Sequence, residues 1–513
     1  MTTLVHETDT VTRDALAVLQ PGFTGTTAPE WLLRHLREGL TSVGLFGRNI
    51  ESAEQLAALT AQLRAVRPDV LVAIDEEGGD VTRLEARTGS SFPGNLALGA
   101  IDDPALTREV ARELGRRLAD CGVNLNWAPS ADVNSNPGNP VIGVRSFGAD
   151  PALVARHTAA YVEGMQAAGV AACTKHFPGH GDTNVDSHHA LPRIDTDLDT
   201  LGTRELVPFR AAVAAGTKVI MSAHILLPAL DPALPATLSP SALNGLLRAP
   251  VEQGGLGYDG LIVTDAVEMK AIADTHGIER GTVLALAAGA DAICVGGGLA
   301  DEHTVLRLRD ALVRAVRDGE LPEQRLADAA ARVRALGRWT AAGAGARQEG
   351  SAPAPAIGLT AARRALRVTP AAPYQPPAGP AFVAAFTPLA NTAVGSETPW
   401  GVGPELAQLL PGTLTGAYGR EQAERDGTGA LIANVLDDAA DRRIVAVIRD
   451  VHRHPWMADA LDSLLAARPD TVVVEMGVPQ SPPAGALHIA THGAARACGR
   501  AAAEVIAGKE AGG

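Results

Sequence analysis

Seven short apolar runs recur between residues 40 and 295, and amphipathic segments separate them. The runs cover residues 40–46, 70–74, 123–128, 170–174, 219–222, 261–264 and 292–295. Short, nearly continuous apolar runs are typical of parallel strands that other elements cover on both faces. Strand and helix therefore alternate, which predicts either a closed (β/α)8 barrel or an open doubly wound sheet.

Polar side chains follow directly after several of these runs. Asp75 ends one run, Lys175 and His176 end another, and His224 and Asp265 end two more. In a barrel the carboxyl ends of all strands converge on one face, where the active sites of such barrels lie. An open sheet would spread the same residues along a line. The clustering of polar residues at strand ends therefore favours a TIM-type (β/α)8 barrel.

The barrel is predicted to occupy residues 1–340, because the alternation of strand and helix continues to that point. Residues 341–380 are rich in Pro and Ala and show no periodicity, as expected of a linker. Strand-like runs then resume at residues 382–386, 444–448 and 471–476. Residues 381–513 are therefore predicted to form a smaller C-terminal α/β sandwich domain.

Composition limits the partners that the chain can have. The 44 basic and 58 acidic residues give a net charge of −14, which argues against general binding to nucleic acid or anionic membranes. No apolar stretch is long enough for a transmembrane helix, and the acidic N-terminus does not resemble a secretory signal. The four cysteines are widely spaced, which indicates a reducing compartment, so a cytoplasmic location is expected.

The segment 175–192, KHFPGHGDTNVDSHHALP, combines four histidines, two aspartates and a lysine directly after a predicted strand. Long loops of this kind at strand ends are usually functional. In one interpretation its imidazoles and carboxylates ligate a metal ion, although their spacing matches no zinc motif such as HExxH. In the other, Asp186 orients the ring of His188, whose second nitrogen then exchanges a proton with the substrate.

Two further segments carry isolated charges. Asp265 follows the run 261–264, so its carboxylate either projects into the barrel mouth or caps the next helix. Residue type alone leaves both possibilities open. Arg145 is the only positive charge in the segment 126–148, and the apolar residues beside it are expected to order its side chain.

The segment 74–84, IDEEGGDVTRL, places Asp75 at the end of a strand and a pair of glycines in a predicted tight turn. Glu76 and Glu77 are interpreted as a surface acidic turn. Arg83 lies further along the chain and is expected to return toward the site.

At these four segments the sequence resembles glycoside hydrolase family 3, in its β-N-acetylglucosaminidase branch. The shared elements are KHFPGHGDTxxDSHxxLP at 175–192, DxEGG at 75–79, NPVIxxRSF at 139–147 and TDAxxM at 264–269. The resemblance covers about residues 15–340 and, more loosely, the C-terminal domain. One departure is Asp80, where this branch commonly has arginine beside the site; a change in aglycone preference is one consequence to test.

The resemblance implies a retaining exo-glycosidase that removes terminal, non-reducing β-linked N-acetylglucosamine. Asp265 matches the family's nucleophile, and His188, paired with Asp186, matches its acid/base. The positions that match its sugar-binding groups are Asp75, Arg83, Arg145, Lys175 and His176. No metal or organic cofactor is required by this chemistry.

The expected partner is a small carbohydrate, either a cell-wall (muropeptide) fragment or a chitin-derived one. A phosphorylase is the alternative, because a histidine acid/base repels phosphate less than a carboxylate would. A metal-dependent hydrolase and a non-catalytic sugar-binding protein are more distant alternatives. The presence of all three catalytic positions, Asp265, His188 and Asp186, argues against the last of these.

Overall fold

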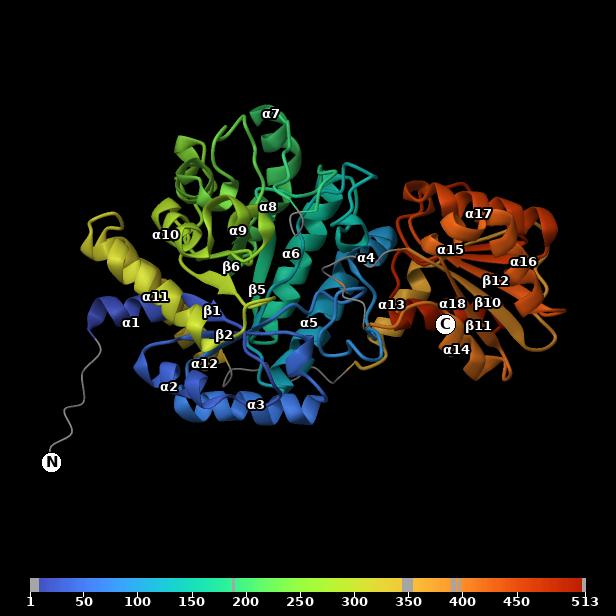
Figure 1. Ribbon diagram of the computed structural model, residues 1–513, viewed down its shortest axis with the longest axis horizontal. Helices are drawn as coiled ribbons and strands as arrows, with labels where there is room; N and C mark the ends of the chain where they lie inside the picture. The colour runs from blue at the N-terminus through green and yellow to red at the C-terminus, as the bar shows by residue number, and fades with distance from the viewer. Residues whose placement is uncertain (1–8, 187–189, 344–353, 389–393, 395–397, 510–513) are drawn as a thin grey trace. The chain divides into compact units, whose positions relative to one another are not determined.

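The computed structural model describes residues 9–186, 190–343, 354–388, 394 and 398–509 (Figure 1). The chain divides into two compact units, and each is built from several stretches of sequence. The first unit comprises Met1–Glu76, Thr107–Pro140 and Ala149–Pro353. The second comprises Glu77–Leu106, Val141–Gly148 and Ala354–Gly513. Among the described residues, no helix is both long and apolar enough to cross a lipid bilayer.

Eight parallel strands form the centre of the first unit. Six of them pair in chain order: β2 (Ser42–Leu45), β3 (Leu71–Ile74), β4 (Leu125–Asn126), β5 (Ala171–Phe177), β6 (Val219–Ser222) and β7 (Leu261–Thr264). β8 (Ile293–Val295) pairs with β1 (Leu19–Pro21), and a parallel bridge joins Val263 to Ala292. Pairing that returns from β8 to β1 gives the predicted TIM-type (β/α)8 barrel.

Helices separate the strands (Figure 1). They are α1 (Thr10–Ala17), α2 (Glu30–Glu38), α3 (Ala53–Val66), α5 (Pro104–Asp120), α6 (Pro151–Ala167), α7 (Leu198–Thr200), α8 (Leu206–Ala214), α9 (Lys270–His276), α10 (Ile278–Ala288), α11 (Glu302–Arg317) and α12 (Glu323–Gly343). Several start at side chains that cap backbone N–H groups: Ser52 caps α3, Asp150 caps α6 and Asp301 caps α11. Every residue of β2, β3, β5, β6 and β7 is buried, which explains why their sequences are almost continuously apolar.

In the described part of the second unit, six strands form a sheet with the order β11-β10-β12-β13-β14-β9, and β9 runs antiparallel to its neighbour β14. The strands are β9 (Arg367–Pro370), β10 (Ala381–Thr387), β11 (Leu414–Gly419), β12 (Arg443–Ile448), β13 (Val472–Glu475) and β14 (Leu487–Ala490). The helices are α4 (Asn95–Ile101), α13 (Ile357–Ala365), α14 (Gly403–Leu409), α15 (Arg420–Asp426), α16 (Thr428–Ala439), α17 (Pro455–Ala467) and α18 (Arg496–Ile506).

Apolar cores lie on both faces of this sheet. Val383 of β10 belongs to one core together with Cys498 of α18, whereas its neighbour Phe382 belongs to the other together with Met457 of α17. Alternate strand residues therefore face opposite helical layers. This arrangement confirms the predicted C-terminal α/β sandwich.

Part of the segment expected as a linker, residues 341–380, is regular structure in the second unit. It contains α13 and β9, and β9 pairs with β14. All four residues of β9 are exposed, so this edge strand carries no apolar run that would reveal it in the sequence. The second unit also includes residues 77–106 and 141–148, which come from the N-terminal half of the chain.

Candidate active site

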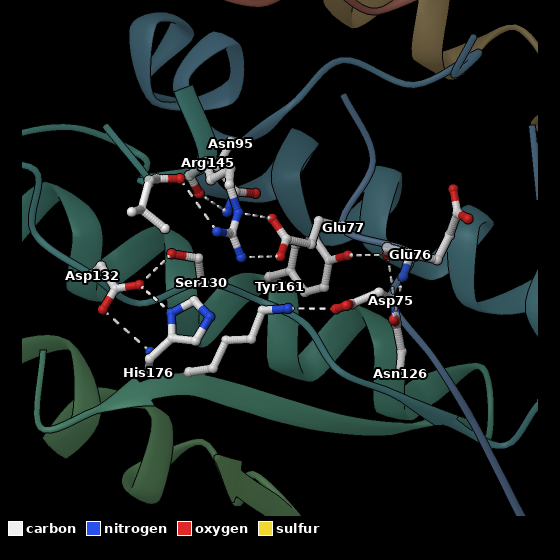
Figure 2. Close-up of polar contacts among 12 residues, drawn as sticks. Asp75, Glu76, Glu77, Asn95, Asn126, Ser130, Asp132, Arg145, Tyr161 and His176 are labelled. Carbon is white, nitrogen blue, oxygen red and sulfur yellow. Dashed lines mark hydrogen bonds and ion pairs between the residues drawn. The ribbon is translucent and has the colours of Figure 1, made fainter. Parts of the chain in front are cut away.

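Asp75 and Lys175 form a charged pair at the carboxyl ends of the barrel strands. Asp75 directly follows β3, and Lys175 belongs to β5, two strands away in the sheet. Lys175 Nζ donates to Asp75 Oδ1 at 2.5 Å, and the lysine side chain is 2% exposed whereas the aspartate is 27% exposed (Figure 2). A buried ammonium group needs such a counter-charge.

Asp132 is a fully buried carboxylate that sequence reasoning missed. It accepts hydrogen bonds from His176 Nδ1 at 2.7 Å, from the backbone N–H of His176 at 3.2 Å and from Ser130 Oγ at 2.9 Å (Figure 2). It also accepts from the backbone N–H of His180 at 2.7 Å. Burial alone would raise the pKa of Asp132, but the His176 ring and the hydrogen bonds outweigh it and hold that pKa below its ordinary value. Asp132 therefore stays ionised and fixes the orientation of His176.

The hydrogen bond to Asp132 also determines what His176 can offer to a substrate. In a neutral ring whose Nδ1 carries the proton, Nε2 is left as an acceptor. His180 is likewise buried, and burial, followed by the nearby His176 ring, lowers the pKa of His180 to about 4. A neutral His180 then packs edge-on against His176, with the ring centroids 5.9 Å apart.

The first part of the segment 175–192 is held by several contacts. Asn139 Nδ2 donates to the carbonyl oxygens of His180 and Gly181 at 2.9 and 3.0 Å. Gly181 has no space for a side chain, because a Cβ there would lie 1.7 Å from the carbonyl oxygen of Val133. Further on, Arg204 Nη2 donates to Asp182 Oδ2 at 2.7 Å.

His188, the predicted acid/base, lies outside the described residues, as do Ser187 and His189. Asp186 is described and is partly buried, and its carbonyl oxygen accepts from the backbone N–H of Ala190 at 3.1 Å. The pairing of Asp186 with His188 therefore stays a prediction. Within the described part of the chain, no group of three or more His, Cys, Asp or Glu residues is arranged to hold a metal ion.

Asp265 continues from β7 beside the end of β6. Its backbone N–H donates to the carbonyl oxygen of Ser222 at 3.1 Å, and its Oδ1 accepts from the backbone N–H of Ala266 at 2.8 Å. The sequence left open whether Asp265 caps the next helix. That helix, α9, begins only at Lys270 and has Met269 at its N-cap, so Asp265 is not its capping residue.

Glu268 is anchored differently from Asp265. Its Oε1 accepts from the backbone N–H groups of Gly296 and Gly298 at 2.7 and 3.3 Å, in the segment after β8. Burial raises the pKa of Glu268, and these backbone hydrogen bonds oppose the rise. Arg48 donates to the carbonyl oxygen of Gly297 at 2.8 Å. Glu268 and Arg48 therefore hold the glycine-rich segment that follows β8.

Arg145 and Glu77 form a buried bidentate pair within the second unit. Arg145 Nε and Nη2 donate to the two carboxylate oxygens of Glu77 at 3.0 and 2.7 Å, and the side chains are 6% and 3% exposed (Figure 2). Asn95 Nδ2 also donates to the carbonyl oxygen of Arg145 at 2.7 Å. Arg145 is therefore held in place by Glu77, a partner that the sequence analysis did not name. Arg83 in the same unit is partly buried, and its Nη1 lies 3.5 Å from the carbonyl oxygen of Thr82.

The interpretation of Glu76 and Glu77 as a surface acidic turn is wrong. Both are buried, at 1% and 4% exposure. Asn126 accepts from the backbone N–H of Glu76 at 3.0 Å and donates to its carbonyl oxygen at 2.7 Å. Glu77 is buried because Arg145, remote in sequence, supplies its counter-charge.

Comparison with known proteins gives consistent results. Residues 24–336 match the model of the Glycosyl hydrolase family 3 N terminal domain. The solved structure of a glycoside hydrolase family 3 beta-N-acetylglucosaminidase from Paenibacillus sp. str. FPU-7 is 33% identical, with a TM-score of 0.84, and the match covers 98% of this chain and 97% of that one.

Two curated relatives match a shorter region. Beta-hexosaminidase A of Pseudoalteromonas piscicida is 36% identical over 316 residues, which are 57% of this chain and 52% of that protein. This chain thus spans about half the length of that relative. Beta-hexosaminidase of Alkalilimnicola ehrlichii is 39% identical over 287 residues, which are 54% of this chain and 80% of that protein.

Proposed function

Because this chain belongs to glycosyl hydrolase family 3, we propose that it is a retaining exo-β-N-acetylglucosaminidase. It hydrolyses terminal, non-reducing β-linked N-acetylglucosamine from small cell-wall (muropeptide) or chitin-derived fragments. The observation that carries the proposal is 33% identity, across 98% of the chain, to the Paenibacillus β-N-acetylglucosaminidase. A cytoplasmic location, expected from the cysteine content, stays a prediction.

In the first step of the proposed reaction, a carboxylate oxygen of Asp265 attacks the anomeric carbon of the sugar. The bond from that carbon to the glycosidic oxygen breaks, and its electron pair leaves with the oxygen. His188, protonated, gives its proton to the departing oxygen, so the aglycone leaves as a neutral alcohol. Asp186 orients the ring and stabilises its charged form.

In the second step, the now neutral His188 takes a proton from a water molecule, whose oxygen attacks the anomeric carbon. The ester bond to Asp265 breaks, which regenerates the carboxylate and the protonated imidazole. Two displacements at the same carbon retain its configuration. The usual retaining pair consists of two carboxyl groups about 5–5.5 Å apart, and here an imidazole takes the place of one of them.

The polar groups at the barrel strand ends suit the binding of a sugar. The Asp75 carboxylate and the Lys175 ammonium group supply an acceptor and donors for neighbouring hydroxyl groups. His176 supplies an acceptor through Nε2 when Asp132 holds its other nitrogen. In the second unit, Arg83 and Arg145 stay proposed sugar-binding residues, because they match the family's positions.

The test compares an aryl β-N-acetylglucosaminide with the matching aryl β-glucoside. The proposal requires rapid cleavage of the first, and cleavage of the second alone would refute it. The same assay in phosphate buffer, followed by analysis for a sugar 1-phosphate, distinguishes hydrolysis from phosphorolysis. Free N-acetylglucosamine as the product supports the hydrolase. A predominant sugar 1-phosphate would show that the enzyme is a phosphorylase.

A further inference from the structure

The carboxyl edge of the sheet in the second unit is where an open α/β sheet normally binds a ligand. In such sheets the crevice lies outside the strand ends, at the point where the strand order reverses. Here β11 and β12 lie on opposite sides of β10, so the reversal is beside β10. At the same edge, but away from β10, the segment 77–106 of this unit contacts residues that follow β12 and β14.

Asp80 is a buried contact between that segment and the residues that follow the sheet strands. Its Oδ1 accepts from the backbone N–H of Ala494, four residues after β14, at 2.7 Å. Its Oδ2 lies 2.5 Å from Nη2 of Arg449, which directly follows β12. The side chains of Asp80 and Arg449 are 2% and 15% exposed. Asp80 therefore faces the sheet and not a solvent-filled aglycone site.

Further contacts join the same segment to the start of α18. The carbonyl oxygen of Ser90 accepts from the backbone N–H of Ala497 at 3.1 Å. Arg496 Nε donates to the carbonyl oxygen of Gly89 at 3.2 Å. The first N–H groups of a helix have no partner inside it and favour negative charge nearby. The carbonyl oxygen of Ser90 therefore binds one of these N–H groups, and the carboxylate of Asp80 binds the N–H of Ala494, just before the helix.

A tight turn connects Asp80 with Glu77. The backbone N–H of Glu77 donates to the carbonyl oxygen of Val81 at 3.1 Å, which closes the turn around Asp80. Gly79 in this turn has a φ of +65°, and a Cβ there would lie 2.4 Å from Cα of Gly94, so the turn is closely packed. A displacement of Asp80 must move Glu77, and Glu77 holds the guanidinium group of Arg145 through both of its oxygens.

We propose that Asp80 and Arg449 are positioning residues that act on the substrate through Glu77 and Arg145. Through these contacts the carboxyl edge of the sheet holds Arg145, a proposed substrate-binding residue of the same unit. The inference rests on the proposed function, because it requires that Arg145 bind the sugar.

The test measures KM and kcat for the full-length chain with an aryl β-N-acetylglucosaminide. Asp80→Asn and Arg449→Met are expected to raise KM about tenfold, the loss expected from a weakened charge-assisted hydrogen bond, with kcat changed less than about twofold. The matched control is Arg364→Met. Arg364 pairs with Asp103 of the same segment at 2.9 Å, but both side chains are largely accessible, at 47% and 34%, so KM should not change.

A double-mutant cycle shows whether Asp80 acts through Arg145. In an Arg145→Lys background, which keeps the charge opposite Glu77 but loses the bidentate pair, Asp80→Asn should raise KM no further. KM does not depend on the amount of folded enzyme, so a variant that is merely less stable leaves it unchanged. Additive effects on KM, or an unchanged KM in Asp80→Asn, would overturn the inference while the proposed function stands. An inactive native enzyme would instead refute the proposed function.

Discussion

Both units bury charged pairs, but they assemble these pairs in different ways. In the barrel, Asp75 and Lys175 meet because the carboxyl ends of the parallel strands lie on one face, although β4 separates β3 from β5. In the second unit, Glu77 and Arg145 belong to a turn and a short irregular segment that the strand order does not bring together. Strand register thus sets the geometry of the barrel pair, and close packing of separate segments sets that of the second pair.

The difference has a functional consequence. Groups at barrel strand ends are held by a rigid hydrogen-bonded ladder, which suits them to chemistry that requires a fixed geometry. Arg145 is held by a chain of contacts from Asp80 through Glu77. We therefore expect changes at the barrel strand ends to alter kcat, and changes along the chain of contacts from Asp80 to Arg145 to alter KM.

The largest expected effect comes from Asp265→Ala. Without the nucleophile no glycosyl-enzyme forms, so kcat should fall by about 10⁴-fold or more. Arg145→Lys should instead raise KM and leave kcat within a fewfold of the native value. Steady-state kinetics of both variants, with mass spectrometry of the trapped intermediate, checks whether Asp265 affects kcat and Arg145 affects KM. Near-normal turnover by Asp265→Ala together with loss of activity in Glu268→Ala would identify a different nucleophile.

The next effect is expected from His188→Ala and depends on the leaving group. A poor leaving group such as a sugar hydroxyl needs the proton, so its cleavage should slow by about 10²–10⁴-fold. An activated phenol leaves with little help, so the first step should survive and the covalent intermediate should accumulate. Asp186→Ala should give a milder version of the same pattern. Equal losses for both substrates, with similar damage in His176→Ala, His180→Ala and His189→Ala, would support a metal-binding role for the segment.

A smaller effect is expected from Asp132→Asn, which tests how strand-end groups are held. One edge of the amide becomes a donor, so the contact with His176 Nδ1 no longer favours the same ring tautomer. We expect kcat/KM to fall on the order of 10²-fold. Asp150→Asn is the matched control, because asparagine caps a helix as well as aspartate does. Native kcat/KM in Asp132→Asn would show that His176 is held without this carboxylate.

The strands that the sequence revealed are those buried on both faces, such as β3 and β6, because burial requires apolar residues at every position. Edge strands show no such pattern: β9 is fully exposed, and half of the residues of β11 are exposed. β1, Leu19–Pro21, is too short to give a pattern. An apolar run therefore predicts a buried strand, whereas a largely exposed strand has too few apolar residues to be predicted from the sequence.

The same limit applies to the site. Asp75 and Lys175 could be predicted because a polar residue at the end of an apolar run is conspicuous. Asp132 could not, because it lies in the long loop between β4 and α6, where polar residues are common. Glu77 was placed on the surface because its partner is 68 residues away. Its burial depends on a long-range ion pair that no local pattern encodes.

The smallest expected effect concerns Glu205, a barrel carboxylate with fewer partners than Asp132. Its Oε1 accepts from Arg204 Nε at 2.6 Å, but its buried Oε2 has no hydrogen-bond partner. Burial raises the pKa of Glu205 to about 7, although Arg204 opposes the rise. Between its ordinary pKa near 4.5 and about 7, the unfolded chain binds fewer protons at Glu205 than the folded chain does. The stability contributed by this group is therefore present at low pH and is lost as the pH rises toward 7.

Glu205→Gln removes this titration while Arg204 keeps its contact with Asp182 at 2.7 Å. Between pH 5 and 8 the Tm of the native protein should therefore fall by roughly 2–5 °C more than the Tm of Glu205→Gln does. The matched control is Glu163→Gln, which removes an exposed glutamate paired with Arg108 and should follow the native curve. Thermal unfolding across this pH range makes the measurement. Parallel curves for native protein and Glu205→Gln would show that the pKa of Glu205 does not differ between the folded and unfolded chain within this pH range.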